Sequence, residues 1–193
     1  MDRVLSESAV TEEQLVAFDV GGETYGVDIA HVQEIIRLPQ ITAIPRAPRF
    51  VEGVINLRGR IIPVVDLRAR FGLPEGETTK ETRIVVGQIG DCTIGMRVDA
   101  VTEVLRVRSD AIEPPSSIVL GADSAYLRGV GRLAGEGEDE TLIILLDTNT
   151  LLSNEHVDDI VEMVEHRTDT PAKSADANAE PEGLVEQEAL ATA

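Results

Sequence analysis

Residues that could act as nucleophiles or metal ligands are scarce in this chain. It contains one cysteine, Cys92, and three histidines, His31, His156 and His166, whose separation in the sequence fits no metal-binding motif. Nucleophilic catalysis needs a serine or cysteine beside a histidine that an acid orients, and no nucleophile-elbow sequence is present. The segment 87–90 (GQIG) lacks the lysine of a phosphate-binding loop. We therefore expect no catalytic residues, no metal, no cofactor and no enzymatic activity.

Two aspartates follow apolar runs of similar pattern, Asp66 in the first half of the chain and Asp147 in the second. A carboxylate in this position accepts hydrogen bonds from the first backbone amides of a helix. Because the two aspartates occupy corresponding positions, we interpret them as helix caps and not as an acid–base pair.

The sequence Asn56-Leu57-Arg58-Gly59 separates two strongly apolar runs and predicts a tight turn. Asn and Gly tolerate the left-handed backbone that such a turn requires. The turn does not explain Arg58, whose rigid guanidinium is suited to binding carboxylates or backbone carbonyls of a partner. Glu34 lies within the apolar segment 32–36, where an acid is interpreted as a contact that gives specificity.

The composition is that of an acidic, aliphatic protein. The 193 residues carry a formal net charge of −18 and are only 3% aromatic, so branched aliphatic side chains must fill the core, and these favour strands. Binding to a phosphate backbone needs clustered Lys and Arg, so the charge argues against nucleic acid and anionic membranes. No apolar run is long enough to span a membrane, and we expect a cytoplasmic protein. A salt-rich host would explain the acidity, and a GC-rich genome would explain why the only lysines are Lys80 and Lys173.

Turn signals divide the first half of the chain into short elements. Alternating residues predict strands at 14–20 and 23–27 around Gly21-Gly22, and strands at 53–57 and 60–65 around Arg58-Gly59. Apolar residues at helical spacing after Asp28 predict a helix over 29–36 that ends before Pro39. A short strand at 41–44 and a short helix at 67–71 complete the pattern.

The second half of the chain repeats the first. Segment 90–95 (GDCTIG) aligns with 21–26 (GGETYG) at an offset of 69 residues, and the match continues at Val32/Val101 and Glu34/Glu103. This period is longer than that of solenoid repeats, so it indicates a duplicated domain. Each copy has about five short strands, which is typical of a small barrel.

The predicted fold is therefore all-β with short helices, in two tandem five-stranded barrels that arose by internal duplication. The predicted boundaries are an N-terminal extension at 1–13, a first barrel at 14–72, a linker at 73–80, a second barrel at 81–153, a helix at 154–166 and a disordered acidic tail at 167–193. Residues from Asn154 onward include 11 acids and two basic residues. A seam lined by Val and Ile between the packed barrels is the predicted binding groove.

Motifs across residues 14–152 resemble those of the CheW family of chemotaxis coupling proteins. The motifs are the segments 25–35 (YGVDIAHVQEI), 53–59 (GVINLRG), 62–68 (IPVVDLR), 98–105 (VDAVTEVL) and 126–131 (YLRGVG). Several motifs in the expected order are more specific than one short motif. The resemblance implies that residues 14–153 form a CheW-like domain, a non-catalytic scaffold of two five-stranded SH3-like barrels.

The resemblance also implies two partners, the regulatory domain of the histidine kinase CheA and the cytoplasmic tip of methyl-accepting chemotaxis receptors. It places receptor contacts at Val32, Glu34, Asn56, Arg58, Val98, Val101 and Val104. It places kinase contacts at Arg58 and Gly59. The protein is then a cytoplasmic adaptor recruited to membrane-associated receptor arrays, without insertion into the membrane and without nucleic acid.

Three other interpretations stay open at this point. A scaffold of another chemosensory pathway, such as one for surface motility, would have the same motifs. A small-ligand-binding or enzymatic double barrel would use the groove between the barrels as its pocket and would gather polar groups there. A scaffold that pairs with itself through its barrels would self-associate in arrays.

Overall fold

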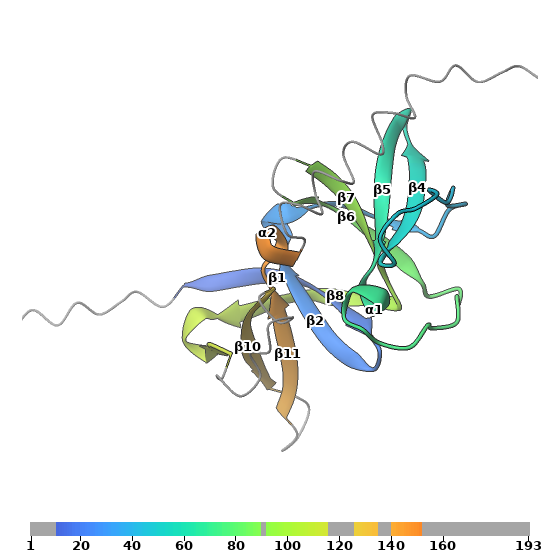
Figure 1. Ribbon diagram of the computed structural model, residues 1–193. Coiled ribbons are helices and arrows are strands. Elements are labelled where there is room, and N and C mark those ends of the chain that lie inside the picture. The colour runs from blue at the N-terminus through green and yellow to red at the C-terminus, as the bar shows by residue number, and fades with distance from the viewer. Residues whose placement is uncertain (1–10, 90–91, 116–125, 135–139, 152–193) are drawn as a thin grey trace, which may run out of the picture.

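The fold consists of strands with a few single-turn helices (Figure 1). The computed structural model describes residues 11–89, 92–115, 126–134 and 140–151. Sheet A has the strand order β8-β1-β2-β11-β10-β9, and sheet B has the order β3-β6-β7-β5-β4. The strands of sheet A are β1 (Glu12–Val20), β2 (Glu23–Asp28), β8 (Ala100–Arg108), β9 (Ile112–Glu113), β10 (Leu127–Ala134) and β11 (Glu140–Leu146). The strands of sheet B are β3 (Val32–Arg37), β4 (Val51–Leu57), β5 (Arg60–Asp66), β6 (Arg83–Ile89) and β7 (Cys92–Val98).

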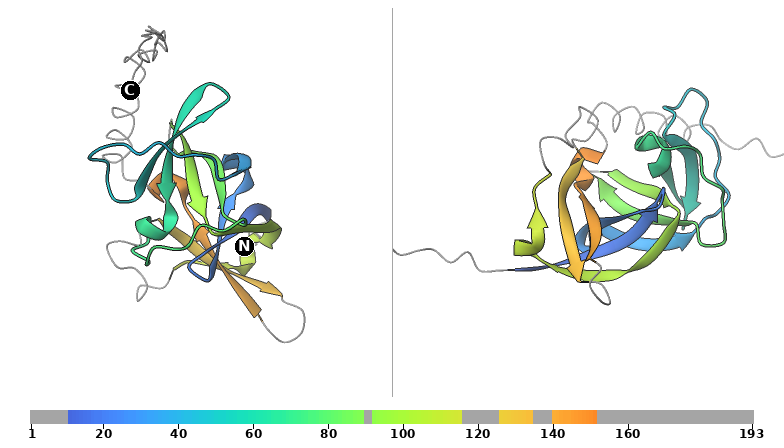
Figure 2. Two further views of the ribbon diagram at one scale, coloured as in Figure 1. Left: turned by 90° about the vertical axis from the view of Figure 1, so that its right-hand side faces the viewer. Right: turned by 90° about the horizontal axis from the view of Figure 1, so that it is seen from below.

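Each sheet takes strands from both halves of the sequence. The first hairpin of the chain, β1–β2, pairs with β8 and β11, and the first hairpin of the second half, β6–β7, pairs with β3 and β5. When β1 to β5 are matched in turn with β6, β7, β8, β10 and β11, the two sheets have the same strand order, and β9 is an addition to sheet A. The predicted duplication is thus present in the topology. In Figure 2 the strands β10 and β11 lie at the opposite end of the molecule from β4 and β5.

The prediction of two β-sheet units is confirmed, with five strands in sheet B and six in sheet A. The prediction that residues 14–72 and 81–153 each form one unit is wrong. The segment 73–80 connects the two halves of the sequence, but it does not separate the two units. The hairpin β1–β2 of the first half belongs to sheet A, and the hairpin β6–β7 of the second half belongs to sheet B, so the two halves exchange their first hairpins. The exchange depends on parallel pairings at Tyr25↔Ile144 and Val64↔Gly95, which join residues far apart in the chain. Such pairings leave no local sequence signal. The expected extension at 1–13 is also shorter, because β1 begins at Glu12.

The predicted helix over 29–36 is wrong as well. A single turn of 3-10 helix, η1 (Ile29–His31), follows Asp28, whose Oδ1 accepts a hydrogen bond from Ala30 N at 2.8 Å, and the chain then continues as strand β3. The β-branched residues of this segment fit a strand as well as a helix, and pairing with β6 decides the outcome. The strand expected at 41–44 is reduced to a single bridge between Thr42 and Val54.

Turns and helix caps follow the sequence closely. Gly21 and Gly22 have φ angles of 67° and 93° in the β1–β2 turn. Asp66 Oδ1 accepts from Arg68 N at 2.8 Å and caps α1 (Leu67–Arg70), and Asp147 Oδ1 accepts from Asn149 N at 2.9 Å at the start of α2 (Thr148–Leu151). The predicted capping role of both aspartates is confirmed. A second 3-10 turn, η2 (Ser109–Ala111), joins β8 to β9.

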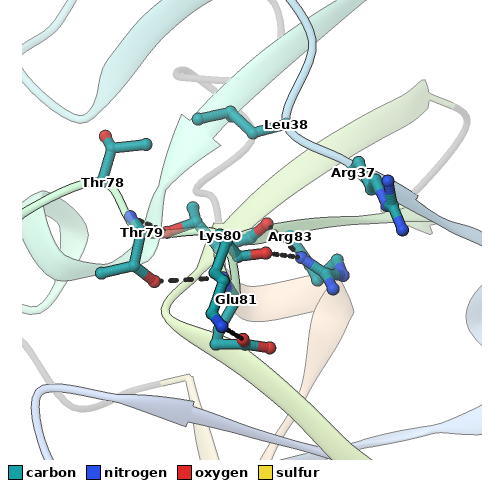
Figure 3. Close-up of a pocket in the computed structure, with 8 residues that line it drawn as sticks. Arg37, Leu38, Thr78, Thr79, Lys80, Glu81 and Arg83 are labelled. Atoms are coloured by element: carbon teal, nitrogen blue, oxygen red, sulfur yellow. Dashed lines mark hydrogen bonds and ion pairs between the residues drawn. The ribbon is translucent and has the colours of Figure 1, made fainter.

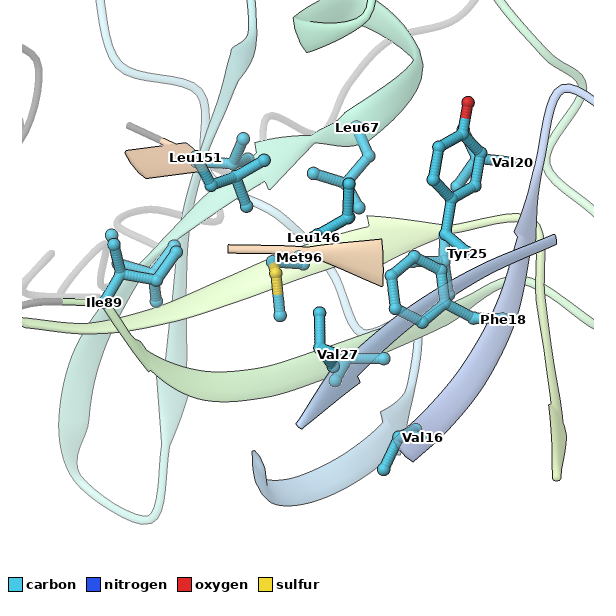
Figure 4. Close-up of a cluster of buried hydrophobic side chains, with 14 of the residues drawn as sticks. Val16, Phe18, Val20, Tyr25, Val27, Leu67, Ile89, Met96, Leu146 and Leu151 are labelled. Carbon is cyan, nitrogen blue, oxygen red and sulfur yellow. The ribbon is translucent and has the colours of Figure 1, made fainter. Parts of the chain in front are cut away.

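Buried side chains form three clusters, one inside each barrel and a larger one between the two sheets (Figure 4). The cluster between the sheets, called here the central core, consists of Val16, Phe18, Val20, Tyr25, Val27, Val51, Val65, Leu67, Val85, Ile89, Ile94, Met96, Val98, Leu146 and Leu151. Its members come from both sheets and from both short α-helices, so the two barrels share one hydrophobic core and form one folded body.

The predicted helix at 154–166 and the predicted tail at 167–193 lie outside the described residues. Within the described ranges, no helix has the length and apolar character needed to cross a membrane.

Candidate functional site

The Asn56–Gly59 turn connects β4 and β5 and has the geometry that its sequence predicts. Arg58 and Gly59 both have positive φ angles, 52° and 85°, as in the two-residue turns that favour hairpins. Asn56 Oδ1 accepts a hydrogen bond from Gly59 N at 2.8 Å. Asn56 and Gly59 therefore stabilise the turn, while the Arg58 side chain is 79% exposed and is held away from the barrel interior.

Arg58 forms an ion pair with Glu34, the other charged residue that the sequence singled out. Arg58 Nη2 donates to Glu34 Oε2 at 2.9 Å, and the Glu34 side chain is 26% exposed. Glu34 belongs to β3 and Arg58 to the hairpin that begins with β4, and these strands are the two edges of sheet B. The ion pair therefore links the ends of the sheet where it curls into a barrel. An ion pair this exposed contributes at most about 1 kcal/mol to stability.

Two exposed apolar side chains lie on the edge strands of the two sheets. Ile35 on β3 is 40% exposed and Val104 on β8 is 52% exposed. Ile35 is directly opposite Val85, and Val104 is directly opposite Val16. Val85 and Val16 belong to the central core, and residues opposite each other project to the same face of a sheet. Ile35 and Val104 therefore extend the inner faces of the two sheets beyond the central core to its rim.

The valines predicted as receptor contacts divide into two groups. Val32 and Val101 are partly buried and pack against the central core, and Val104 is at its exposed rim. Val98 is 2% exposed and is a member of the central core itself. A side chain at this depth has no surface to offer a partner, so the placement of Val98 among surface contacts is corrected. Its effect on binding can only be indirect, through packing.

The interior of the seam is filled with side chains, which corrects the expectation of an open groove between the barrels. The central core occupies it (Figure 4). Cavities lined by described residues lie elsewhere: one of about 520 Å³ beside residues 78–83, one of about 480 Å³ beside α2 and one of about 290 Å³ beside Pro114 and Pro115. Apolar contact residues are thus available at the rim of the seam and not along a groove floor.

Among the described residues, the side chains that could act as nucleophiles or metal ligands do not gather into a reactive site. No set of three His, Cys, Asp or Glu residues is placed to hold a metal there. His31 Nδ1 lies 3.1 Å from Thr148 Oγ1, a contact that joins η1 to α2. Cys92 is partly buried against the central core. His31 and Cys92 therefore take part in contacts that hold the fold together.

Two networks of charged residues brace the junction of the sheets. Arg68 donates to both carboxylate oxygens of Asp99 at 2.7 Å, and Asp99 Oδ2 also accepts from Gly21 N at 2.8 Å. Burial opposes ionisation of Asp99, but these hydrogen bonds outweigh it, and the pKa of Asp99 lies below its ordinary value. Asp99 connects β7 to β8 and thereby ties the two sheets together.

The second network is centred on Arg97, which is 3.1 Å from Glu52 Oε1 and 3.5 Å from Asp66 Oδ2. Arg97 also donates to Thr78 Oγ1 at 2.7 Å and so fixes the segment between the halves. Burial raises the pKa of Glu52, partly offset by the attraction of Arg97. The buried Oε2 of Glu52 has no hydrogen-bond partner among the described residues.

Sequence reasoning did not identify Ile35 as a surface residue. The helical spacing predicts Ile35 on the apolar stripe of a helix, and only the strand geometry brings it to the rim opposite Val85. The signal was present in the repeat, because Ile35 and Val104 correspond at the offset of 69 residues that relates Glu34 to Glu103. The repeat indicates that the two positions are equivalent, but their exposure follows only from the structure.

Comparison with known proteins gives one family. The family model described as CheW-like domain matches residues 14–156. Chemotaxis protein CheW of Klebsiella aerogenes is 37% identical over 153 residues, 79% of this chain and 89% of that protein. Protein FrzA of Myxococcus xanthus is 33% identical over 144 residues, 75% of this chain and 88% of that protein.

A solved structure supports the same assignment. The scaffolding protein TtCheW of Thermoanaerobacter tengcongensis has a TM-score of 0.67 and 36% sequence identity, and the match covers 76% of this chain and 91% of that one. The structural match and the family model each cover about three quarters of the chain. The protein belongs to the CheW-like domain family.

Proposed function

We propose that this protein is a chemotaxis scaffold that couples receptors to the histidine kinase CheA and has no catalytic activity of its own. The observation that carries the proposal is the Arg58–Glu34 ion pair at the β4–β5 turn, in which the Arg58 side chain is 79% exposed. Exposed arginines whose guanidinium keeps free donors are among the residues that dominate protein interfaces. The relatives named Chemotaxis protein CheW and the relative described as a scaffolding protein support the same function.

For the receptor, we propose the rim of the central core as the contact surface. Val32 and Ile35 on β3 and Val101 and Val104 on β8 present aliphatic side chains at the two outer strands. The occupant is the cytoplasmic tip of a chemoreceptor, a helical hairpin whose apolar side chains would cover this surface. Glu34 precedes Ile35 on β3 but projects from the other face of the strand, opposite Val86, so we propose it as a charged contact next to the rim and not as part of it.

For the kinase, we propose contacts around the β4–β5 turn. The guanidinium of Arg58 is exposed at the tip, and Gly59 has open space around its α-carbon. The Asn56–Gly59 hydrogen bond fixes the geometry of the turn before a partner binds. Because the turn does not have to become ordered on binding, the entropic cost of association is lower. We place the regulatory domain of CheA here.

A role as a scaffold fits the chemistry of the described residues better than catalysis does. The seam between the sheets, where an enzymatic double barrel would place its pocket, is filled by the aliphatic and aromatic side chains of the central core. The charged groups with shifted pKa values in this region, Asp99 and Glu52, are engaged in bracing contacts with Arg68 and Arg97.

A second candidate is a scaffold of the same construction in another chemosensory pathway, for example one that controls surface motility. The similarity to Protein FrzA, at 33% identity, favours keeping it. The two candidates share the binding surfaces and differ in which receptor and kinase they serve, so binding to each set of partners distinguishes them.

Isothermal titration calorimetry of the full chain with the CheA regulatory domain, and separately with a receptor tip, tests the proposal. Arg58→Ala should weaken kinase binding, while Arg46→Ala should not, because Arg46 is also exposed and also has a positive φ angle, 65°, but is not paired with Glu34. Equal effects of the two variants, or no binding by the unmodified chain, would contradict the proposal.

A further inference from the structure

A cationic cavity lies beside the segment that joins the halves of the sequence (Figure 3). Its volume is about 520 Å³, and it is lined by Arg37, Leu38 and residues 78–83. Arg37, Lys80 and Arg83 contribute three positive charges to the lining, and Glu81 contributes one negative charge. Lys80 is one of only two lysines in a chain with a net charge of −18, so this concentration of cations is unusual for the protein.

The two arginines of the cavity are placed unfavourably with respect to each other. Arg37 on β3 and Arg83 on β6 are directly opposite in the register of sheet B. Like charges in opposed positions destabilise a sheet. Arg83 Nη1 donates to the carbonyl oxygens of Lys80 and Thr82, at 2.7 and 2.9 Å, and among the described residues no carboxylate pairs with Arg37 or Arg83. A negatively charged group bound between them would relieve this repulsion.

Net charge is distributed very unevenly over the molecule. The segments that form sheet B, residues 32–66 and 83–98, contain seven arginines and four acids, a net charge of +3. The segments that form sheet A, residues 12–28, 100–113 and 127–146, contain four arginines and 12 acids, a net charge of −8. The segment 154–193 contains 11 acids and two basic residues, a net charge of −9. The barrel built on sheet B is therefore the cationic part of an acidic protein.

We propose that the acidic segment at 155–188 of the same chain binds to the cationic cavity formed by Arg37, Lys80 and Arg83. Lys80 Nζ lies 4.0 Å from Glu81 Oε1, so the lining keeps a net charge of +2, which the carboxylates of the segment would neutralise. The negative barrel built on sheet A repels these carboxylates toward sheet B. A carboxylate between Arg37 and Arg83 makes charge-assisted hydrogen bonds with two guanidinium groups at once. The interaction is electrostatic and is weakened by salt.

The path of the chain permits this contact. Leu151, the last described residue, is buried in the central core together with Ile89, and α2 lies against β6. The cavity is at the other end of β6, at Arg83, which is about 20 Å away for a strand of this length. Asp169 is 18 residues after Leu151, and an extended chain of this length can span up to about 60 Å. The acids between 169 and 188 are therefore within reach.

The proposed contact has a consequence for the surface of β3. Arg37 is three residues beyond Glu34 on this strand, so a segment bound at the cavity covers the end of the strand that carries Ile35. This inference concerns the chain alone and does not depend on the proposed function.

Paramagnetic relaxation enhancement in the full chain tests the contact. A spin label on Ser174→Cys, in a chain whose native cysteine is replaced by Cys92→Ser, should broaden the amides of residues 79–83 more than other described amides at low salt. The broadening should disappear in about 1 M sodium chloride, where the screening length is about 3 Å. It should also disappear in Arg37→Gln/Lys80→Gln, which leaves the backbone contacts of Arg83 intact.

The matched control is Arg49→Gln/Arg106→Gln, which removes the same charge from two exposed arginines outside the cavity and should leave the broadening unchanged. A mixture of isotope-labelled protein without spin label and spin-labelled protein without isotope distinguishes a contact within one chain from one between two copies. Uniform broadening, equal loss in both variants, or broadening in the mixture would overturn the proposal. Failure of this test leaves partner binding by the unmodified chain unaffected.

Discussion

Arg58 Nη2 lies 2.9 Å from Glu34 Oε2, and this ion pair joins the two edge strands of sheet B. The two residues are 24 positions apart in the sequence, one in a tight turn and the other in an apolar segment. The ion pair brings the two candidate contact residues, Arg58 and Glu34, together at one place on the surface. Because Arg58 is mostly exposed, its guanidinium keeps donors free for a partner while one remains bonded to Glu34.

Replacing Arg58 should separate binding from stability. Arg58→Ala is expected to lower the free energy of unfolding by no more than about 1 kcal/mol, because the pair is exposed, and to weaken kinase binding about tenfold or more. Urea unfolding and calorimetric titration measure the two quantities on the same sample. A loss of stability large enough to account for the loss of binding would make Arg58 a structural residue.

A charge exchange tests whether the pair contacts a partner directly. Glu34→Arg/Arg58→Glu retains an opposite-charge pair at the same place, so stability should stay within about 1 kcal/mol of the unmodified protein. Binding should remain weak, because donors and acceptors are then presented to the partner in reversed positions. Recovery of full affinity in the double variant would show instead that the pair only braces the barrel.

The rim residues should govern receptor binding. Ile35→Ser and Val104→Ser each remove an exposed apolar side chain, so unfolding should change little while affinity for a receptor tip falls by about tenfold. Leu142→Ser is the control, because Leu142 is also exposed but lies on β11, beside the cavity at Pro114 and Pro115 and away from the rim. Surface plasmon resonance with an immobilised receptor tip gives the three affinities, and equal losses for all three would remove the rim from the account.

Asp99 should make stability depend on pH. Its pKa is lowered in the folded protein, so it contributes stability above the ordinary carboxyl pKa and loses that contribution as the pH falls through its folded value. Asp99→Asn should therefore cost about 1–2 kcal/mol at pH 7, and the cost should shrink below about pH 4. Urea unfolding at several pH values measures it; the same cost at every pH would show that charge is not involved.

Glu52 should behave in the opposite way. Burial raises the pKa of this carboxyl, so folding favours its protonated form at low pH and this advantage is lost as the pH rises. The stability of Glu52→Gln relative to the unmodified protein should therefore improve between pH 4 and pH 7. A relative stability that worsens over this range would show that attraction to Arg97 outweighs burial.

Gly53 should tolerate no side chain. Its φ angle is 153°, and a β-carbon there would clash with the carbonyl oxygen of Thr42 and the side chain of Ile41. Gly53→Ala should cost roughly 2–4 kcal/mol, whereas Gly59→Ala, in open space at a φ of 85°, should cost about 1 kcal/mol. Thermal unfolding compares the two variants, and similar costs would mean that close packing at Thr42 is not what requires glycine.

Local features of this fold could be predicted from the sequence. Turns at Gly21-Gly22 and Arg58-Gly59 and caps at Asp66 and Asp147 depend on neighbouring residues, and all four are present as predicted. The duplication was also visible, because two copies of one motif align without knowledge of the fold. The Asn56–Gly59 hydrogen bond follows from the same local chemistry.

Features that depend on distant pairing could not be predicted in this way. The segment 32–36 has apolar residues that fit a helix or a strand, and its pairing with β6 selects the strand. Exchange of the first hairpins likewise depends on contacts between halves, such as Tyr25↔Ile144. The depth of Val98 follows from that exchange, because β7 then packs into the central core.

Sedimentation of the full chain mixed with the CheA regulatory domain and a receptor tip tests whether the β4–β5 turn and the rim of the central core hold the two partners at once. We expect a species that contains all three components, and we expect Arg58→Ala to lose this species while Arg46→Ala keeps it. If neither partner binds, or if the three-component species is the same with both variants, Arg58 does not hold the two partners together.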